Sequence, residues 1–240
     1  MRTELPVNER LKNVPFPDPS INAIDSPVET VYYLPDRIYT SDDLTNVKLG
    51  VWDYENKKWS TDQIGGQLQF NKETRQINFT TTKFAPIAML QSRCMDYPYQ
   101  DWKLRCVDSE TAILDLTTKR MSLVFEIGPR YLKLIECGAK ELSHLMNTEY
   151  QPGFLLQELS KCGVHLLPRD EDAKLAGIEL KDRAAEERAI LDICINVRAV
   201  HFRKAKWNQG AAGQEGIGAQ QVLMKIRENL EFDRVFQEDY

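Results

Sequence analysis

The sequence is poor in the residues that build metal sites and redox centres. It has three histidines and five cysteines in 240 residues, and the cysteines stand far apart with no Cys-x-x-Cys pair. A disulfide framework or a zinc site needs Cys, or Cys and His, at short and regular intervals. The histidines, His144, His165 and His201, never fall at a ligand spacing such as i, i+4. We therefore expect neither a metal nor a cofactor.

Long apolar runs and an excess of positive charge are also missing. The first residues, Met1–Leu11, lack the continuous apolar stretch of a signal peptide. No later window approaches the run of about 20 apolar residues that a membrane helix needs. Lys and Arg number 31 against 36 Asp and Glu, so the net charge of −5 disfavours nonspecific binding of nucleic acid. We expect a cytoplasmic protein with no membrane and no nucleic-acid partner.

The composition is that of a globular protein. Hydrophobic residues make up 42% and charged residues 28% of the chain, and a chain of this length would bury roughly 70–75% of its unfolded surface. The N-terminal part differs, because six prolines occur between Leu5 and Pro35 and each removes a backbone donor. We predict a proline-rich extended arm over residues 1–30. The apolar run Val31–Leu34 at its end should lie against the body or a partner.

Apolar residues alternate with polar ones between Lys48 and Cys137, in short segments separated by turn residues. This period of two is typical of antiparallel strands joined by hairpins. Together these segments predict an antiparallel β-sandwich over residues 31–137. The candidate strands are Lys48–Asp53, Gln67–Phe70, Gln76–Thr81, Ala85–Gln91, Lys103–Val107, Thr111–Thr117, Ser122–Ile127 and Tyr131–Glu136.

After Cys137 the apolar spacing changes to that of helices, which predicts a mixed C-terminal part over residues 138–240 that packs on the sandwich. One short helix is expected around Leu142–Met146, and a second should begin at Pro152 and end near Gly163. A short strand ended by Pro168 and a charged, exposed helix follow. The last part fits a terminal hairpin across residues 209–218, or a helix beginning near Val222. The predicted fold class is thus α+β.

Three groupings have part of the pattern of a catalytic site. The glycine-rich loop of residues 210–218 lacks the pattern of a phosphate-binding loop. Cys162 and His165 could form a thiol nucleophile pair, but nothing supplies an orienting third group. The order Trp52, Trp59, then Thr82–Ala85 resembles self-cleaving adhesion-receptor domains, yet the upstream general base is missing. We expect no enzyme; a thiol-dependent or self-processing domain is the alternative, and a peptide-binding regulatory sandwich is a third.

Aromatic and basic groupings are the candidates for protein binding. Aromatic side chains often anchor protein interfaces, and a basic run can contact an acidic partner surface such as tubulin. Packing in the core explains Trp102 equally well, and a solvated strand face explains the basic run. The candidate binding residues are Tyr32, Tyr33, Tyr97, Tyr99, Trp102, Arg203, Lys204 and Lys206.

Several segments resemble the C-terminal region of the Casc (cancer susceptibility candidate) family. They are Gly50–Trp52, Phe70–Ala85, Pro98–Arg105, Gly163–Pro168 and Ala205–Asn208. The resemblance extends over residues 32–240. It implies a non-catalytic accessory protein of the intermediate-chain type in the inner-arm dynein of the axoneme, in a cilium or flagellum. Dynein subunits and the tubulin of the doublet microtubule would be its partners. Members of the family are usually longer, so this chain is expected to be a C-terminal fragment or a shortened homologue.

Overall fold

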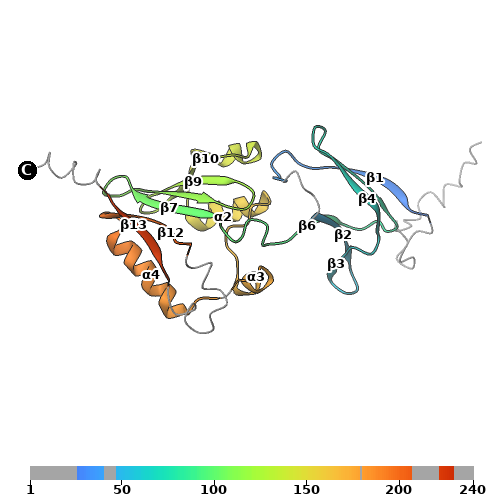
Figure 1. Ribbon diagram of the computed structural model, residues 1–240. Helices are drawn as coiled ribbons and strands as arrows, with labels where there is room; N and C mark the ends of the chain where they lie inside the picture. Colours follow the sequence, from blue (N-terminus) through green and yellow to red (C-terminus); the bar gives the residue numbers. More distant parts are fainter. Residues whose placement is uncertain (1–25, 41–46, 179, 207–221, 230–240) are drawn as a thin grey trace, which may run out of the picture. The chain divides into compact units, whose positions relative to one another are not determined.

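The computed structural model describes residues 26–40, 47–178, 180–206 and 222–229, and these fall into two compact units (Figure 1). Unit 1 lies within Met1–Pro35 and Leu44–Gln91, and unit 2 within Asp36–Asp43 and Ser92–Tyr240. Unit 1 contains the strands β1 (Val28–Tyr33), β2 (Val47–Asp53), β3 (Lys58–Ser60), β4 (Ile64–Asn71), β5 (Gln76–Thr81) and β6 (Ile87–Gln91).

Unit 1 is a β-sandwich of two three-stranded antiparallel sheets. One sheet has the order β1-β5-β4 and the other β3-β2-β6. The alternation in β5 turns Ile77 and Phe79 into the core, where they cluster with Leu49 of β2. All three are at most 4% exposed, and burying such a side chain stabilises the fold by about 1.5–3 kcal/mol. The predicted α+β fold with an antiparallel sandwich is confirmed.

The first strand corrects the predicted end of the arm. Residues 1–25 lie outside the described residues, but β1 begins at Val28 and pairs with β5, with Tyr32 opposite Ile77. Residues 28–30 therefore belong to the sheet. The physical reason is local, because no proline interrupts the chain between Pro27 and Pro35 and β-branched and aromatic residues favour pairing there. Of the apolar run only Leu34 is buried, at 4% exposure, whereas Val31, Tyr32 and Tyr33 are 52%, 38% and 64% exposed.

Unit 2 is built on a seven-stranded antiparallel sheet of order β11-β10-β9-β8-β7-β12-β13. Its middle is a meander in which neighbours in sequence pair, as predicted from the short turns. One face carries Trp102, Leu104, Leu114 and Phe125, and α2 and η1 pack against this side. The strands are β7 (Asp101–Cys106), β8 (Ala112–Thr117), β9 (Ser122–Ile127), β10 (Leu132–Cys137), β11 (Glu149–Tyr150), β12 (Val200–Lys204) and β13 (Met224–Glu228).

The grouping of strands differs from the predicted ranges. The range 31–137 is divided between the two units, because β7 to β10 share a core with the C-terminal elements and not with β2 to β6. Alternating apolar residues identify strands, but they do not tell which strands bury their faces together. After Cys137, the side chains of Leu142, Leu155 and Leu159 are fully buried in the core of unit 2.

The helices are short. They are η1 (Lys140–Leu145), a 3-10 helix, and α2 (Pro152–Lys161), α3 (Asp170–Leu175) and α4 (Arg183–Asn196). The predicted charged helix is broken, because Gly177 has a φ of +67° and Asp182 caps a new helix by accepting a hydrogen bond from Ala185 N. Residues 164–167 form no strand, which corrects that prediction. The terminal hairpin is confirmed by the pairing of β12 with β13, although the loop of residues 209–218 lies outside the described residues.

Candidate functional site

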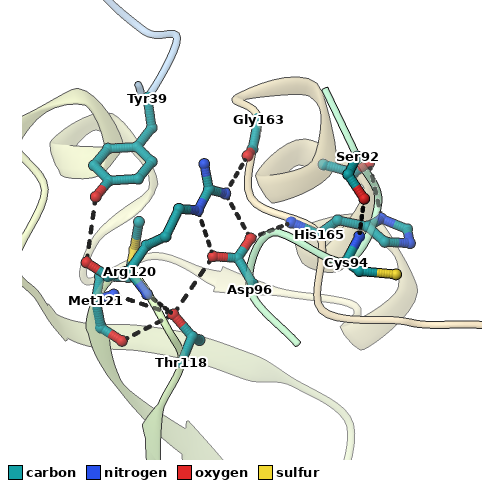
Figure 2. Close-up of polar contacts among 10 residues, drawn as sticks. Tyr39, Ser92, Cys94, Asp96, Thr118, Arg120, Met121, Gly163 and His165 are labelled. Atoms are coloured by element: carbon teal, nitrogen blue, oxygen red, sulfur yellow. Dashed lines mark hydrogen bonds and ion pairs between the residues drawn. The ribbon is translucent and has the colours of Figure 1, made fainter. Parts of the chain in front are cut away.

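A buried ion pair fixes the loop of residues 92–100 before β7 (Figure 2), which also carries the candidate residues Tyr97 and Tyr99. Asp96 has no exposed side-chain surface and Arg120 has 6%. The guanidinium binds the carboxylate with two hydrogen bonds, from Nε to Oδ1 at 2.8 Å and from Nη2 to Oδ2 at 2.6 Å. The backbone N–H of His165 donates to Asp96 Oδ2 at 3.0 Å. A charge removed from water is tolerated when it is paired and hydrogen-bonded in this way.

The same arginine connects segments that are far apart in sequence. Its Nη2 atom also donates to the carbonyl of Gly163 at 2.7 Å, directly after α2. Its guanidinium carbon lies 5.0 Å from the centroid of the Tyr39 ring, a cation–π contact. Tyr39 is held in turn by a backbone hydrogen bond to Cys162 O at 2.8 Å. Arg120 thus ties together the turn between β8 and β9, the end of α2 and the segment of residues 36–40.

The aromatic residues of the loop turn partly inward. The Tyr97 and Tyr99 rings meet edge to face with their centroids 5.6 Å apart. The Tyr99 hydroxyl donates to the carbonyl of Leu166 at 2.5 Å. Burial, followed by the nearby Tyr97 and Asp96, raises the pKa of Tyr99 to about 12. Tyr99 is therefore a neutral hydrogen-bond donor throughout the physiological range.

An apolar cavity of about 440 Å³ opens beside this loop. Its lining comes from one face of β7 to β10 together with α2 and α4, and it includes Tyr99, Trp102 and Ile193. Helix α4, which contributes Ile193, exposes other large apolar side chains to solvent, with Ile190 at 59% and Ile195 at 75%. Exposed apolar surface of this kind is typical of interaction sites. The cavity and the outer side of α4 together form an apolar region of unit 2.

The predicted basic group is split by strand alternation. Arg203 is exposed and faces Asp101, with 3.8 Å between the charged atoms. Lys204 turns the other way, and its ammonium donates to the carbonyls of Tyr99 and Gln100. Burial lowers the pKa of Lys204. Lys206 follows β12 and is exposed.

The remaining two candidate residues lie in unit 1. Tyr32 and Tyr33 are 38% and 64% exposed on β1, which is an edge strand of its sheet. The Tyr33 hydroxyl accepts a hydrogen bond from Gln76 Nε2 at 2.9 Å. The structure therefore gathers Tyr97, Tyr99, Trp102 and Lys204 around one end of β7, while Tyr32 and Tyr33 form a separate exposed group.

The thiols and histidines show no arrangement that would activate a nucleophile within the described ranges. Cys162 Sγ lies 3.9 Å from Nε2 of His144, while the ring nitrogens of His165 contact Arg93 and Ser160. Burial raises the pKa of the Cys162 thiol, and likewise that of Cys106 and Cys137, which disfavours the thiolate. Among the described residues no group of three or more His, Cys, Asp and Glu could hold a metal ion. No helix in the part that the structure describes is long and apolar enough to cross a membrane.

Sequence reasoning missed the Asp96–Arg120 pair. The two residues are 24 positions apart, and neither stands in a motif with a fixed spacing. A weak signal was available, because Arg120 comes two residues after Thr118 in a tight turn between two apolar strands, where a charged side chain can fold back over the sheet.

The described part of the chain is a β-rich protein of two compact units. No family model matches the chain. Comparison with curated proteins finds similarity to dynein axonemal intermediate chain 7 of several animals. It is 26% identical over 188 residues to dynein axonemal intermediate chain 7 of Bos taurus, which covers 77% of this chain and 25% of that protein.

Two further relatives extend the same similarity. The Ciona intestinalis homolog of dynein axonemal intermediate chain 7 is 25% identical over 226 residues, covering 89% of this chain and 29% of its own length. The Homo sapiens protein of that name is 25% identical over 207 residues, covering 85% of this chain and 28% of its own length. The chain thus spans about a quarter of the length of these curated relatives.

Proposed function

We propose that this chain is a non-catalytic binding module of the axonemal dynein machinery. Its place would be the axoneme of a cilium or flagellum, in the inner dynein arm, with dynein subunits and the doublet microtubule as partners. The observation that carries the proposal is the similarity to dynein axonemal intermediate chain 7, which extends over 77–89% of the chain in three relatives. The similarity covers more of the chain than either structural unit contains by itself.

The geometry of unit 2 supports a docking role. The buried Asp96–Arg120 pair holds the loop before β7 in one conformation, so little conformational entropy would be lost when a partner binds there. The apolar cavity and α4 lie beside that loop, and Ile190 and Ile195 of α4 offer exposed apolar surface. A rigid support with exposed apolar groups is the arrangement that protein interfaces use for their anchors.

The chemistry of the thiols supports a role without catalysis. A thiol-dependent enzyme needs a cysteine whose pKa is lowered by a neighbouring base or cation. In this chain burial raises the pKa of Cys162, and its nearest imidazole atom, in His144, is 3.9 Å away. Both properties suit a packed structural cysteine.

A co-sedimentation experiment tests the proposal. The full chain is mixed with purified doublet microtubules, with and without a salt extract of axonemal dynein, at low and at moderate ionic strength. We expect the chain to pellet with the reconstituted dynein and doublets. Recovery in the supernatant under all conditions would contradict the proposal. Pelleting only when dynein is present would assign the contact to dynein and remove the tubulin part.

A variant with changed docking residues sharpens this experiment. Replacing Ile190 and Ile195 by serine should reduce pelleting several-fold without unfolding the protein, because both side chains are largely exposed. The matched control replaces Leu175, which is 81% exposed on α3, by serine. Equal loss for both variants would show a nonspecific effect of surface hydrophobicity.

A further inference from the structure

One face of the sheet in unit 2 carries a concentration of positive charge that the linear sequence conceals. On β7, Lys103 and Arg105 point away from the apolar cavity, since Trp102 and Leu104 line it. The register places Arg203 of β12 opposite Lys103. The same strand pairs with β13, where Lys225 lies opposite Arg203. The outer face of these three strands therefore presents its charged side chains side by side.

Five cations belong to this outer basic face, namely Lys103, Arg105, Arg203, Lys225 and Arg227. All five are exposed. Two carboxylates share this face, Asp101 of β7, which lies 3.8 Å from Arg203, and Asp115 of β8, which is opposite Lys103. The chain as a whole has a net charge of −5, so a local excess of positive charge stands out against an acidic background. Such a face attracts an acidic partner.

The outer basic face ends at an edge strand. In the sheet order β13 is terminal, with β12 as its hydrogen-bonded neighbour on one side and no described strand on the other. In Figure 1 it lies at the border of the sheet next to β12. An edge strand presents backbone N–H and C=O groups that can pair with another chain. On the opposite face from Lys225 and Arg227, Ile226 is 67% exposed.

We propose that β13 accepts an extended segment of a partner protein in which acidic and apolar residues alternate. The segment would add as a further strand, so that its acidic side chains lie next to Lys225 and Arg227 about 4.8 Å away across the strand spacing. Its apolar side chains would fall on the other face and cover Ile226. Three features of the edge, the backbone groups, the cations and the exposed apolar side chain, are matched by this one pattern.

A polyanion without a strand-forming backbone matches fewer of these features. Phosphate groups of a nucleic acid could neutralise the cations, but they would leave Ile226 and the backbone groups of β13 uncovered. The observations therefore favour an acidic polypeptide. The biological setting of this peptide site rests on the docking function proposed above. Its peptide binding can be measured without dynein or microtubules.

The test uses the full chain and a fluorescent peptide in which Glu and Val alternate over eight residues, read by anisotropy at low ionic strength. A peptide of the same composition with four Glu followed by four Val is the comparison. The variant Lys225→Glu/Arg227→Glu should weaken binding of the alternating peptide by at least about tenfold, since two favourable charge pairs become repulsive. The control Lys119→Glu/Arg130→Glu changes the net charge equally, in exposed turns of the same sheet, and should alter binding less than about threefold.

Hydrogen exchange read by mass spectrometry locates the contact. Strand addition requires that the amides of residues 224–228 exchange more slowly when the alternating peptide is bound. Equal binding of the two peptides, or binding without protection of β13, would overturn strand addition. No binding by the full chain, or tighter binding of single-stranded RNA than of the peptide, would overturn the proposal of an acidic polypeptide partner. If the chain binds the alternating peptide but does not co-sediment with dynein, that result contradicts the proposed function and leaves the peptide site standing.

Discussion

Removing Arg120 while keeping Asp96 tests how much the buried ion pair stabilises the loop of residues 92–100 before β7. In the variant Arg120→Met the carboxylate stays fully buried and loses hydrogen bonds of 2.8 Å and 2.6 Å. Its remaining partners are the N–H of His165 and the hydroxyl of Thr118. Breaking one side of a buried ion pair costs about 3–5 kcal/mol. The loss of the contacts to Gly163 and Tyr39 acts in the same direction.

A double-mutant cycle separates the charge pair from packing. The variants Arg120→Met, Asp96→Asn and the combination are compared by hydrogen exchange of β8 and β9 in increasing urea. In the double variant, the loss of unfolding free energy of unit 2 should be at least about 2 kcal/mol smaller than the sum of the losses in the two single variants. Strand β5 serves as an internal reference, because it lies in unit 1.

Two results would refute this reasoning. If Arg120→Met lowered the stability of unit 2 by less than about 1 kcal/mol, the pair would be worth no more than an exposed one. If β5 were destabilised equally, the effect would not belong to the loop.

Three other properties can be checked directly. Burial raises the pKa of Tyr99 from 10.0 to about 12, so the folded state favours the neutral phenol. The stability that this shift contributes is complete below about pH 10 and is lost as the pH approaches 12. Urea midpoints measured across this range should show the loss, and Tyr99→Phe should lessen it. Cys194 is exposed whereas Cys162 is buried, so a thiol reagent at about pH 8 should label one cysteine quickly, and Cys194→Ser should remove that phase. Leu134→Ala, at a side chain with 0% exposure, should lower the stability of unit 2 by about 2–5 kcal/mol in urea unfolding, and a cost below about 1 kcal/mol would contradict the packed core.

Strand positions could be predicted well because the signal is local. In β5 the alternation of Ile77 and Phe79 with polar residues is visible in the sequence. Strand β3 was missed because it has only three residues, Lys58–Ser60, too few for a period to show. The division into units could not be predicted, since which strands share a core depends on contacts between distant residues such as Leu49 and Phe79.

The candidate residues show the same limit. The run Arg203, Lys204 and Lys206 reads as one basic cluster along the chain, but the pleat of β12 sends the side chains of Arg203 and Lys204 to opposite faces. The outer basic face needs pairing between strands that are about a hundred residues apart, as in Arg203 with Lys103. No local pattern contains that information.

The position of this chain in an intact axoneme is the most direct test of whether it belongs to the inner dynein arm. The protein is labelled with a small tag that electron cryotomography can locate, and averaged maps of the doublet repeat are compared with and without the tag. We expect additional density at the inner dynein arms. Density at another part of the axoneme, or no enrichment in the axoneme, would contradict it.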